Sequence, residues 1–238
     1  MPTCDAAPAR GWIEVPRART GAWGARLARG DAALPARASR MLVVDQASRA
    51  REHVALRSMF AARKRVFVDL LKWDLTVLAG RYEVDRHDGP GATYLIVADA
   101  GGQHLASARL LPEPAAGLDL FSEHIFDGGA PTAGVAEVTH FCLSPDVAVN
   151  DRRRARDRLL YGLVDYALAH RIHRFVGIAE GRWTRPVEEL GWTCRRLGAV
   201  PSSCRRKLVG MMVDIDATTP ARLARAGVAA PTPPGRAS

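Results

Sequence analysis

Three carboxylates crowd into one short stretch of this chain. Residues 80–89 read GRYEVDRHDG and place Glu83, Asp85 and Asp88 within six positions. Taken alone, the aspartates are more typical of a solvated loop, because Asp is common in turns, and a site for a cationic ligand is the alternative. Glu137 is harder to assign to a surface, because it lies in the apolar run VAEVTHFCL. A buried acid costs free energy unless it is paired.

Cationic and aromatic side chains accompany these acids. The segment RKRVFVDLLKW supplies Arg63, Phe67 and Trp73 upstream, and Arg109 lies before LLP in a strand-like run downstream. Aromatic faces and carboxylates together suit a ligand that carries positive charge. Taken singly, Phe67 and Trp73 are more typical of a hydrophobic core.

The order and spacing of these groups form a pattern. It reads R-x3-F-x5-W, then E-x-D-x2-D, then R-LLP, then E-x-T-x-F. This pattern resembles the acyl-homoserine-lactone synthases, the LuxI-type autoinducer synthases of bacterial quorum sensing, over about residues 41–216. That family has E-x-[ST]-R-F as its last motif, and this chain has His140 in place of the Arg. Arg is always cationic whereas His titrates near neutral pH, so the departure thins the network of carboxylates and guanidiniums.

The resemblance implies a reaction between two substrates, S-adenosylmethionine and an acyl thioester of acyl carrier protein or coenzyme A. The amine of S-adenosylmethionine attacks the thioester carbonyl, and its carboxylate then closes on the γ-carbon. The products are methylthioadenosine and an N-acyl-homoserine lactone. S-adenosylmethionine is a substrate in this scheme, and no cofactor, metal, nucleic acid or membrane is expected to take part.

The same resemblance assigns roles to residues. The expected catalytic residues are Glu137, Arg109, Asp85, Asp88 and His140, with Glu137 as the general base because an ammonium must lose a proton before it attacks. The expected S-adenosylmethionine-binding residues are Arg63, Phe67, Trp73, Asp85 and Thr139.

An acyl tunnel is expected between helix 154–170 and strand 174–180. Its expected lining residues are Val138, Leu160, Leu163, Gly177 and Ala179. Many family members that prefer 3-oxo chains have Thr where Gly177 stands. Without that hydroxyl we expect no selection of a 3-oxo group, and the glycine leaves room for a long, branched or aromatic acyl group.

Charge is distributed unevenly along the chain. The net charge of +9 includes basic ends, with +4 in residues 1–40 and +3 in residues 217–238. The remaining body is −3 up to Glu137 and +5 after it, which favours two ligands of opposite charge over a nucleic-acid stripe. The run RRRAR at 152–156 is either a solvated helix start or a patch that attracts the anionic acyl donor.

The periodicity predicts a three-layer α/β/α sandwich with a mixed, mostly antiparallel sheet, resembling the GNAT-type acyltransferase fold. The expected helices are 48–71, 154–170 and 184–190, and the expected strands are 93–100, 104–112, 135–143, 174–180 and 207–215. We expect a disordered extension at 1–40, an autoinducer synthase domain at 41–216 and a flexible tail at 217–238. No apolar run approaches the ~18 residues of a membrane span. The four cysteines show no CxxC pair, which indicates reduced thiols in a cytoplasmic protein.

Two alternatives remain open. A GNAT-type N-acyltransferase that uses acyl-CoA needs a glycine-rich phosphate turn at a helix start, but the chain reads NDRRRARDR there and has no glycine until Gly162. A non-enzymatic nucleic-acid-binding protein with basic tails lacks a recognisable module in the nearly neutral body.

Overall fold

The computed structural model describes residues 39–112, 118, 121, 125, 134–200 and 207–231. Within these residues the chain forms a seven-stranded sheet and a two-stranded hairpin. The sheet runs in the order β1 (Ser39–Val44), β4 (Thr93–Asp99), β5 (His104–Leu111), β6 (Val135–Leu143), β7 (Arg174–Glu180), β9 (Leu208–Asp214) and β8 (Thr193–Val200). The hairpin joins β2 (Val77–Leu78) to β3 (Tyr82–Glu83).

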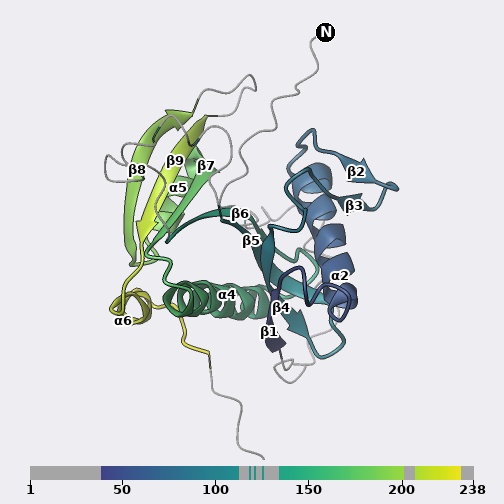
Figure 1. Cartoon of the computed structure of the whole chain (residues 1–238), viewed down its shortest axis with the longest axis horizontal. Coiled ribbons are helices and arrows are strands. Elements are labelled where there is room, and N and C mark those ends of the chain that lie inside the picture. The colour runs from purple at the N-terminus through teal and green to yellow at the C-terminus, as the bar shows by residue number, and fades with distance from the viewer. Residues whose placement is uncertain are drawn as a thin grey trace, which may run out of the picture.

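The helices lie on both faces of the sheet (Figure 1). They are α2 (His53–Arg63), the π-helix η1 (Lys64–Leu70), α4 (Val149–Ala169), α5 (Gly181–Glu188) and α6 (Thr219–Arg225). Alternation along β4 sets the two faces: Tyr94 and Ile96 pack with α2, whereas Leu95 and Val97 pack with α4. The predicted three-layer α/β/α sandwich is confirmed.

Only one neighbouring pair of strands in the sheet is parallel. β6 and β7 pair with each other only at Val135–Glu137 with Arg174–Val176, and beyond these residues each continues to pair with its other neighbour, β5 or β9. Beyond this point β7, β9 and β8 turn away from β6 (Figure 1). The other neighbouring strands are antiparallel, so the predicted mixed, mostly antiparallel sheet is also confirmed.

The first helix differs from the expected 48–71. Regular α-helix begins at His53, and after Arg63 it changes to a π-helix that ends at Leu70. Two of its apolar residues, Val54 and Leu70, are 45% and 48% exposed. The wider π-turn shifts the buried face, so that Val66 and Phe67 are both buried.

The C-terminal boundary also differs from the expectation of a flexible tail from residue 217. Leu223 of α6 and Val228 are buried against the main core. The backbone N–H of Ala229 donates to Oδ2 of Asp157 at 3.1 Å, and the hydroxyl of Tyr161 donates to the carbonyl of Pro220 at 3.3 Å. Residues 219–229 therefore belong to the folded domain. Residues 1–38 of the expected extension at 1–40 lie outside the described part of the chain. The last two residues of that range already belong to β1, which begins at Ser39.

None of the described helices is both long and apolar enough to cross a membrane.

Candidate active site

Arg63, near the end of α2, is completely buried and holds two of the three acids. Its Nε donates to Oε2 of Glu83 at 2.6 Å, and its two terminal nitrogens donate to the two oxygens of Asp88 at 2.8 and 3.0 Å. The bidentate pair of Arg63 with Asp88 fixes the orientation of the carboxylate as well as balancing its charge. Burial works to lower the pKa of Arg63, but Glu83 and Asp88 outweigh it and raise that pKa. Arg63 therefore orients the acids.

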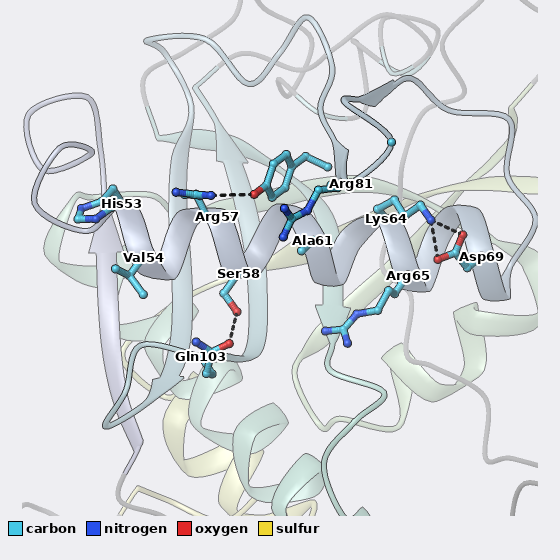
Figure 2. Close-up of a pocket in the computed structure, with 12 residues that line it drawn as sticks. His53, Val54, Arg57, Ser58, Ala61, Lys64, Arg65, Asp69, Arg81 and Gln103 are labelled. Carbon is cyan, nitrogen blue, oxygen red and sulfur yellow. Dashed lines mark hydrogen bonds and ion pairs between the residues drawn. The ribbon is translucent and has the colours of Figure 1, made fainter.

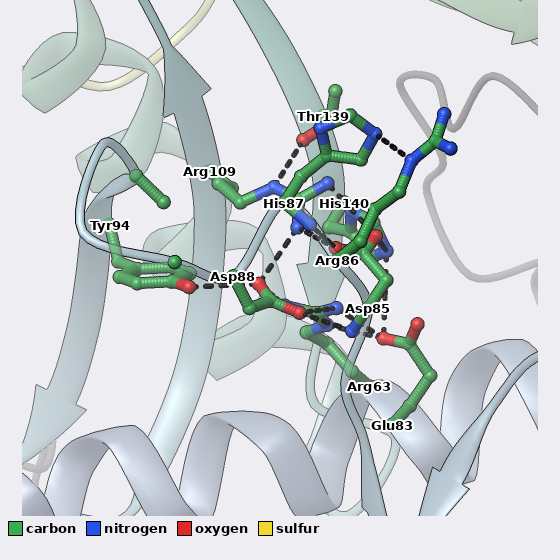
Figure 3. A network of polar contacts seen from close by, with 12 residues as sticks. Arg63, Glu83, Asp85, Arg86, His87, Asp88, Tyr94, Arg109, Thr139 and His140 are labelled. Atoms are coloured by element: carbon green, nitrogen blue, oxygen red, sulfur yellow. Dashed lines mark hydrogen bonds and ion pairs between the residues drawn. The ribbon is translucent and has the colours of Figure 1, made fainter. Parts of the chain in front are cut away.

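Arg109 holds the acid cluster from the sheet side. From β5 it donates to Asp85 at 2.7 and 3.2 Å, to Asp88 at 2.8 Å and to the hydroxyl of Thr139 at 2.9 Å (Figure 3). Burial works to raise the pKa of Asp88, but the charges of Arg63 and Arg109 outweigh it and hold that pKa well below its ordinary range. The Asp88 carboxylate is thus ionised, and two guanidiniums fix it in place.

Two members of this network were missing from the expected site. Glu83 was part of the quoted acid motif, which was the signal that could have identified it. Tyr94 of β4 donates its hydroxyl to Oδ1 of Asp88 at 2.8 Å, and burial together with Asp88 raises the pKa of Tyr94. A tyrosine in an apolar strand gives no sequence signal of such a contact.

A β-bulge brings Thr139 and His140 to the same side of β6. Ser107 pairs with Cys142 and Arg109 with Thr139, so β6 carries one extra residue between these pairs. That residue is His140, with φ of 50°, a region in which His is more common than most side chains. Its Nε2 lies 3.5 Å from Glu83 and 3.8 Å from Asp85 (Figure 3). The imidazole therefore takes the place that the family motif gives to Arg.

An aromatic cluster adjoins this network. Phe67 of η1 stacks on Trp73 with ring centroids 5.2 Å apart, and it meets the His140 ring edge-on at 5.4 Å. Trp183 of α5 packs against the cluster as well as against the main core. Phe67 and Trp73 are buried, so they serve as packing and as a wall beside the acids. Trp183 was not among the expected site residues.

Glu137 lies on β6 at the last residue paired with β7, opposite Val176. It is almost completely buried. Alternation places its side chain on the same face as Thr139, whose hydroxyl contacts Arg109. Glu137 therefore lies where the network face of the sheet meets the divergence of β6 and β7.

The expected acyl-binding residues lie on the opposite face. Val138, Leu160, Leu163 and Ala179 belong to one buried apolar cluster that includes α4. Gly177 lies between Phe175 and Ala179 on β7, so alternation places it on the same face. The sheet separates this apolar face from the ion network, except where β6 and β7 diverge.

The basic run at the start of α4 is partly engaged within the fold. The guanidinium of Arg152 donates to the carbonyls of Ser144, Pro145 and Val147 at 3.0 to 3.1 Å. Arg156 pairs with its neighbour Asp157 at 2.6 Å. Arg152 therefore anchors the loop before α4.

The described cysteines contribute no nucleophile. Cys142 and Cys194 are free thiols, as predicted for this pair. Burial raises the pKa of each to about 12, so both are protonated near neutral pH.

Comparisons with known proteins agree with this architecture. A family model described as autoinducer synthase matches residues 47–223. An acyl-homoserine-lactone synthase of Ralstonia nicotianae is 30% identical over 175 residues, which cover 68% of this chain and 82% of that protein. One of Agrobacterium fabrum is 29% identical over 168 residues, which cover 67% and 78%.

Solved structures show the same fold. MesI, a CoA-dependent acyl-homoserine lactone synthase, superposes with a TM-score of 0.66 at 22% identity, covering 81% of this chain and 97% of that one. TofI, in a ternary complex with an inhibitor and MTA, gives 0.60 at 28% identity and covers 78% and 96%. A putative N-acetyltransferase from Lactobacillus plantarum gives 0.51 at 17%, covering 75% and 99%.

The mixed-sheet sandwich with its buried ion network is that of an acyltransferase, as the match to the autoinducer synthase family and its curated relatives shows. The chain belongs to the autoinducer synthase family, and it is an acyl-homoserine-lactone synthase. The family match decides against both alternatives that the sequence left open.

Proposed function

We propose that the two substrates bind on opposite faces of the sheet and react where β6 and β7 diverge. S-adenosylmethionine binds on the α2 face, beside Phe67, Trp73 and the acid network, and the acyl chain lies on the α4 face. The observation that carries this proposal is the limited pairing of β6 with β7, which ends at Glu137. Glu137 is thereby the acid nearest to the point where the two faces communicate.

We assign the chemistry to groups at this point. Glu137 accepts a proton from the ammonium of S-adenosylmethionine, directly or through a water, and the free amine then attacks the thioester carbonyl. Arg63 and Arg109 keep the acids in position, so the field that attracts the sulfonium and ammonium is preorganised. Backbone N–H groups of β6 beyond Glu137 that do not pair with β5 are candidates to stabilise the oxyanion.

We propose that the acyl donor presents a phosphopantetheine thioester, as both acyl-CoA and acyl carrier protein do. Two structural neighbours, MesI and BjaI, are CoA-dependent acyl-homoserine lactone synthases, and the BjaI structure contains SAM and isopentyl-CoA. The absence of a hydroxyl at Gly177 supports an unsubstituted acyl group over a 3-oxo group. Since these donors are metabolites of the cytoplasm, we place the enzyme there.

A donor competition tests the choice between the two carriers. The same acyl group is supplied at equal concentrations as acyl-CoA and as acyl-acyl carrier protein, with a different isotope label in the acyl group of each donor. The enzyme and S-adenosylmethionine are added, and mass spectrometry of the lactone shows which acyl label it carries. The more abundant label identifies the preferred carrier. A 3-oxo donor of the same length is expected to react no faster than the unsubstituted one. A clear preference for the 3-oxo donor would contradict the role given to Gly177.

A further inference from the structure

A groove of about 670 Å³ lies over the solvent-facing side of α2 (Figure 2). Arg63 and the acid network occupy the buried side of the same helix. The groove draws its walls from α2, η1, the β2–β3 turn and the β4–β5 turn. It is therefore separate from both substrate sites proposed above.

The groove is strongly basic. Arg57, Lys64, Arg65 and Arg81 line it, and Asp69 is the acidic residue among its lining residues. Lys64 pairs with Asp69 at 2.8 Å, and Arg65 pairs with an aspartate outside the groove. These pairs leave a net positive charge, although the N-terminal half of the body is net negative by residue count.

The arrangement of the cations leaves room for a ligand between them. Arg57 and Arg65 both line the groove, with the small side chain of Ala61 between them along the helical segment, and their side chains extend toward opposite edges of the helix (Figure 2). The two arginines are eight residues apart, about two helical turns, so the surface above Ala61 between them is open to a ligand. An extended anion above Ala61 would contact cations at both ends of this space.

Neutral groups on both sides complete the groove. The Arg57 guanidinium donates to the Tyr82 hydroxyl at 3.2 Å, and the Arg81 guanidinium lies 5.7 Å from the centre of the Tyr82 ring. On the other side Ser58 donates to Gln103 at 3.3 Å (Figure 2). Hydroxyl and amide groups beside guanidiniums are suitable partners for phosphate oxygens.

We propose that this groove binds a small molecule that carries a chain of phosphate groups. Guanidinium forks match phosphate oxygens in pairs, and several cations spread around one hollow fit several linked phosphates better than one isolated charge. The volume lies within the roughly 300–1,000 Å³ of small-ligand sites. Tyr82 faces this groove while its neighbour Glu83 contacts Arg63, so the ligand contacts the strand that supplies the ion network.

Calorimetric titration of the full chain with inorganic tripolyphosphate tests the proposal without any turnover. One molecule is expected to bind per chain with a Kd below about 100 µM at low salt, and binding weakens as salt rises. Citrate, a polyanion without phosphate, is expected to bind at least about tenfold more weakly. Failure of tripolyphosphate to bind at about 1 mM, or equal binding of citrate, would overturn the proposal.

A double substitution locates the site. Arg57→Gln with Arg81→Gln should weaken tripolyphosphate binding by at least about tenfold, because two charge-assisted contacts are lost. Arg225→Gln removes an exposed arginine of α6, outside the groove, and is the matched control that should bind normally. Equal weakening in the control, or tighter binding of a poly-glutamate peptide than of tripolyphosphate, would reject a phosphate site in this groove.

Discussion

Nε2 of His140 lies 3.5 Å from Oε2 of Glu83, and both side chains are almost completely buried. The same carboxylate accepts a hydrogen bond from Arg63 at 2.6 Å. A histidine at this position therefore continues the contact between β6 and the acid network that the family motif makes with an arginine. The contact depends on the bulge, because strict alternation would turn His140 away from Thr139.

Replacement of His140 should reduce the use of S-adenosylmethionine. His140→Asn tolerates the positive φ but has a shorter side chain, so its contact with Glu83 is lost. We expect kcat/KM for S-adenosylmethionine to fall by about tenfold, the usual effect of losing a charge-assisted contact. His140→Arg restores the family residue and should stay within about threefold of the wild type. Methylthioadenosine release measures both, and an Asn variant as active as the wild type would contradict the role.

Asp88 should matter more to stability than its partner Tyr94. Asp88 accepts hydrogen bonds from Arg63, Arg109, Tyr94 and the backbone of Asp85. Asp88→Asn leaves two buried guanidiniums without their shared charge and should cost about 3–5 kcal/mol. Tyr94→Phe removes one neutral donor and should cost about 1 kcal/mol. Urea unfolding at neutral pH compares them, and equal losses would show that the charge at Asp88 is unimportant.

Donor attraction by the start of α4 can be tested with its exposed arginines. Arg153 and Arg154 are exposed, whereas Arg152 anchors a loop and is left intact. Arg153→Glu with Arg154→Glu should raise KM for an acyl carrier protein donor and leave KM for S-adenosylmethionine unchanged. The defect should shrink with salt, because exposed charges are screened beyond about 8 Å at physiological ionic strength. Equal changes in KM for both substrates, or no change in either, would show that the basic run at 152–156 is only the solvated start of a helix.

Stability should fall in mild acid because of His104. Burial, assisted by the charges of Arg65 and Arg63, lowers the pKa of His104 to about 3. Below the unfolded value of 6.5 the unfolded chain binds a proton that the folded chain excludes, so stability is full above pH 6.5 and is lost as pH falls toward 3. The loss reaches about 5 kcal/mol at the lower limit, at about 1.4 kcal/mol per pH unit.

Urea unfolding between pH 7.5 and pH 5 measures the slope. His104→Gln retains a polar side chain near Ser107 but cannot take up the proton. Its stability should decline less steeply between these pH values than that of the wild type. Parallel declines would show that His104 does not contribute to the acid sensitivity.

The ion network was largely predictable because its members recur in an ordered sequence pattern. Arg63, Asp85, Asp88 and Arg109 meet as the pattern implied. The bulge at His140 was not predictable, because it depends on how β5 pairs with β6 rather than on any local residue. The charge count did not reveal the basic groove, because a net charge summed over the first half of the body does not report where its charges lie on the surface.

Parts of the fold lacked a local signal. β1 lies at one edge of the sheet and has a short run of four apolar residues, and β8 at the other edge is half exposed and contains two adjacent arginines, so neither was predicted as a strand. α6 is short and rich in Ala and Arg, which is also typical of a tail. Its position depends on tertiary contacts, such as the one from Ala229 to Asp157, that no sequence pattern reports.

The most direct test of the account compares the products of the wild type with those of Glu137→Gln. With S-adenosylmethionine and a panel of acyl thioesters, mass spectrometry should find methylthioadenosine and an N-acyl-homoserine lactone in equal amounts. Glu137→Gln should melt near the wild-type temperature and react about 10²–10⁴-fold more slowly, the usual effect of losing a general base. No lactone from folded wild-type protein with any donor, or a Gln variant within about threefold of the wild type, would contradict the account.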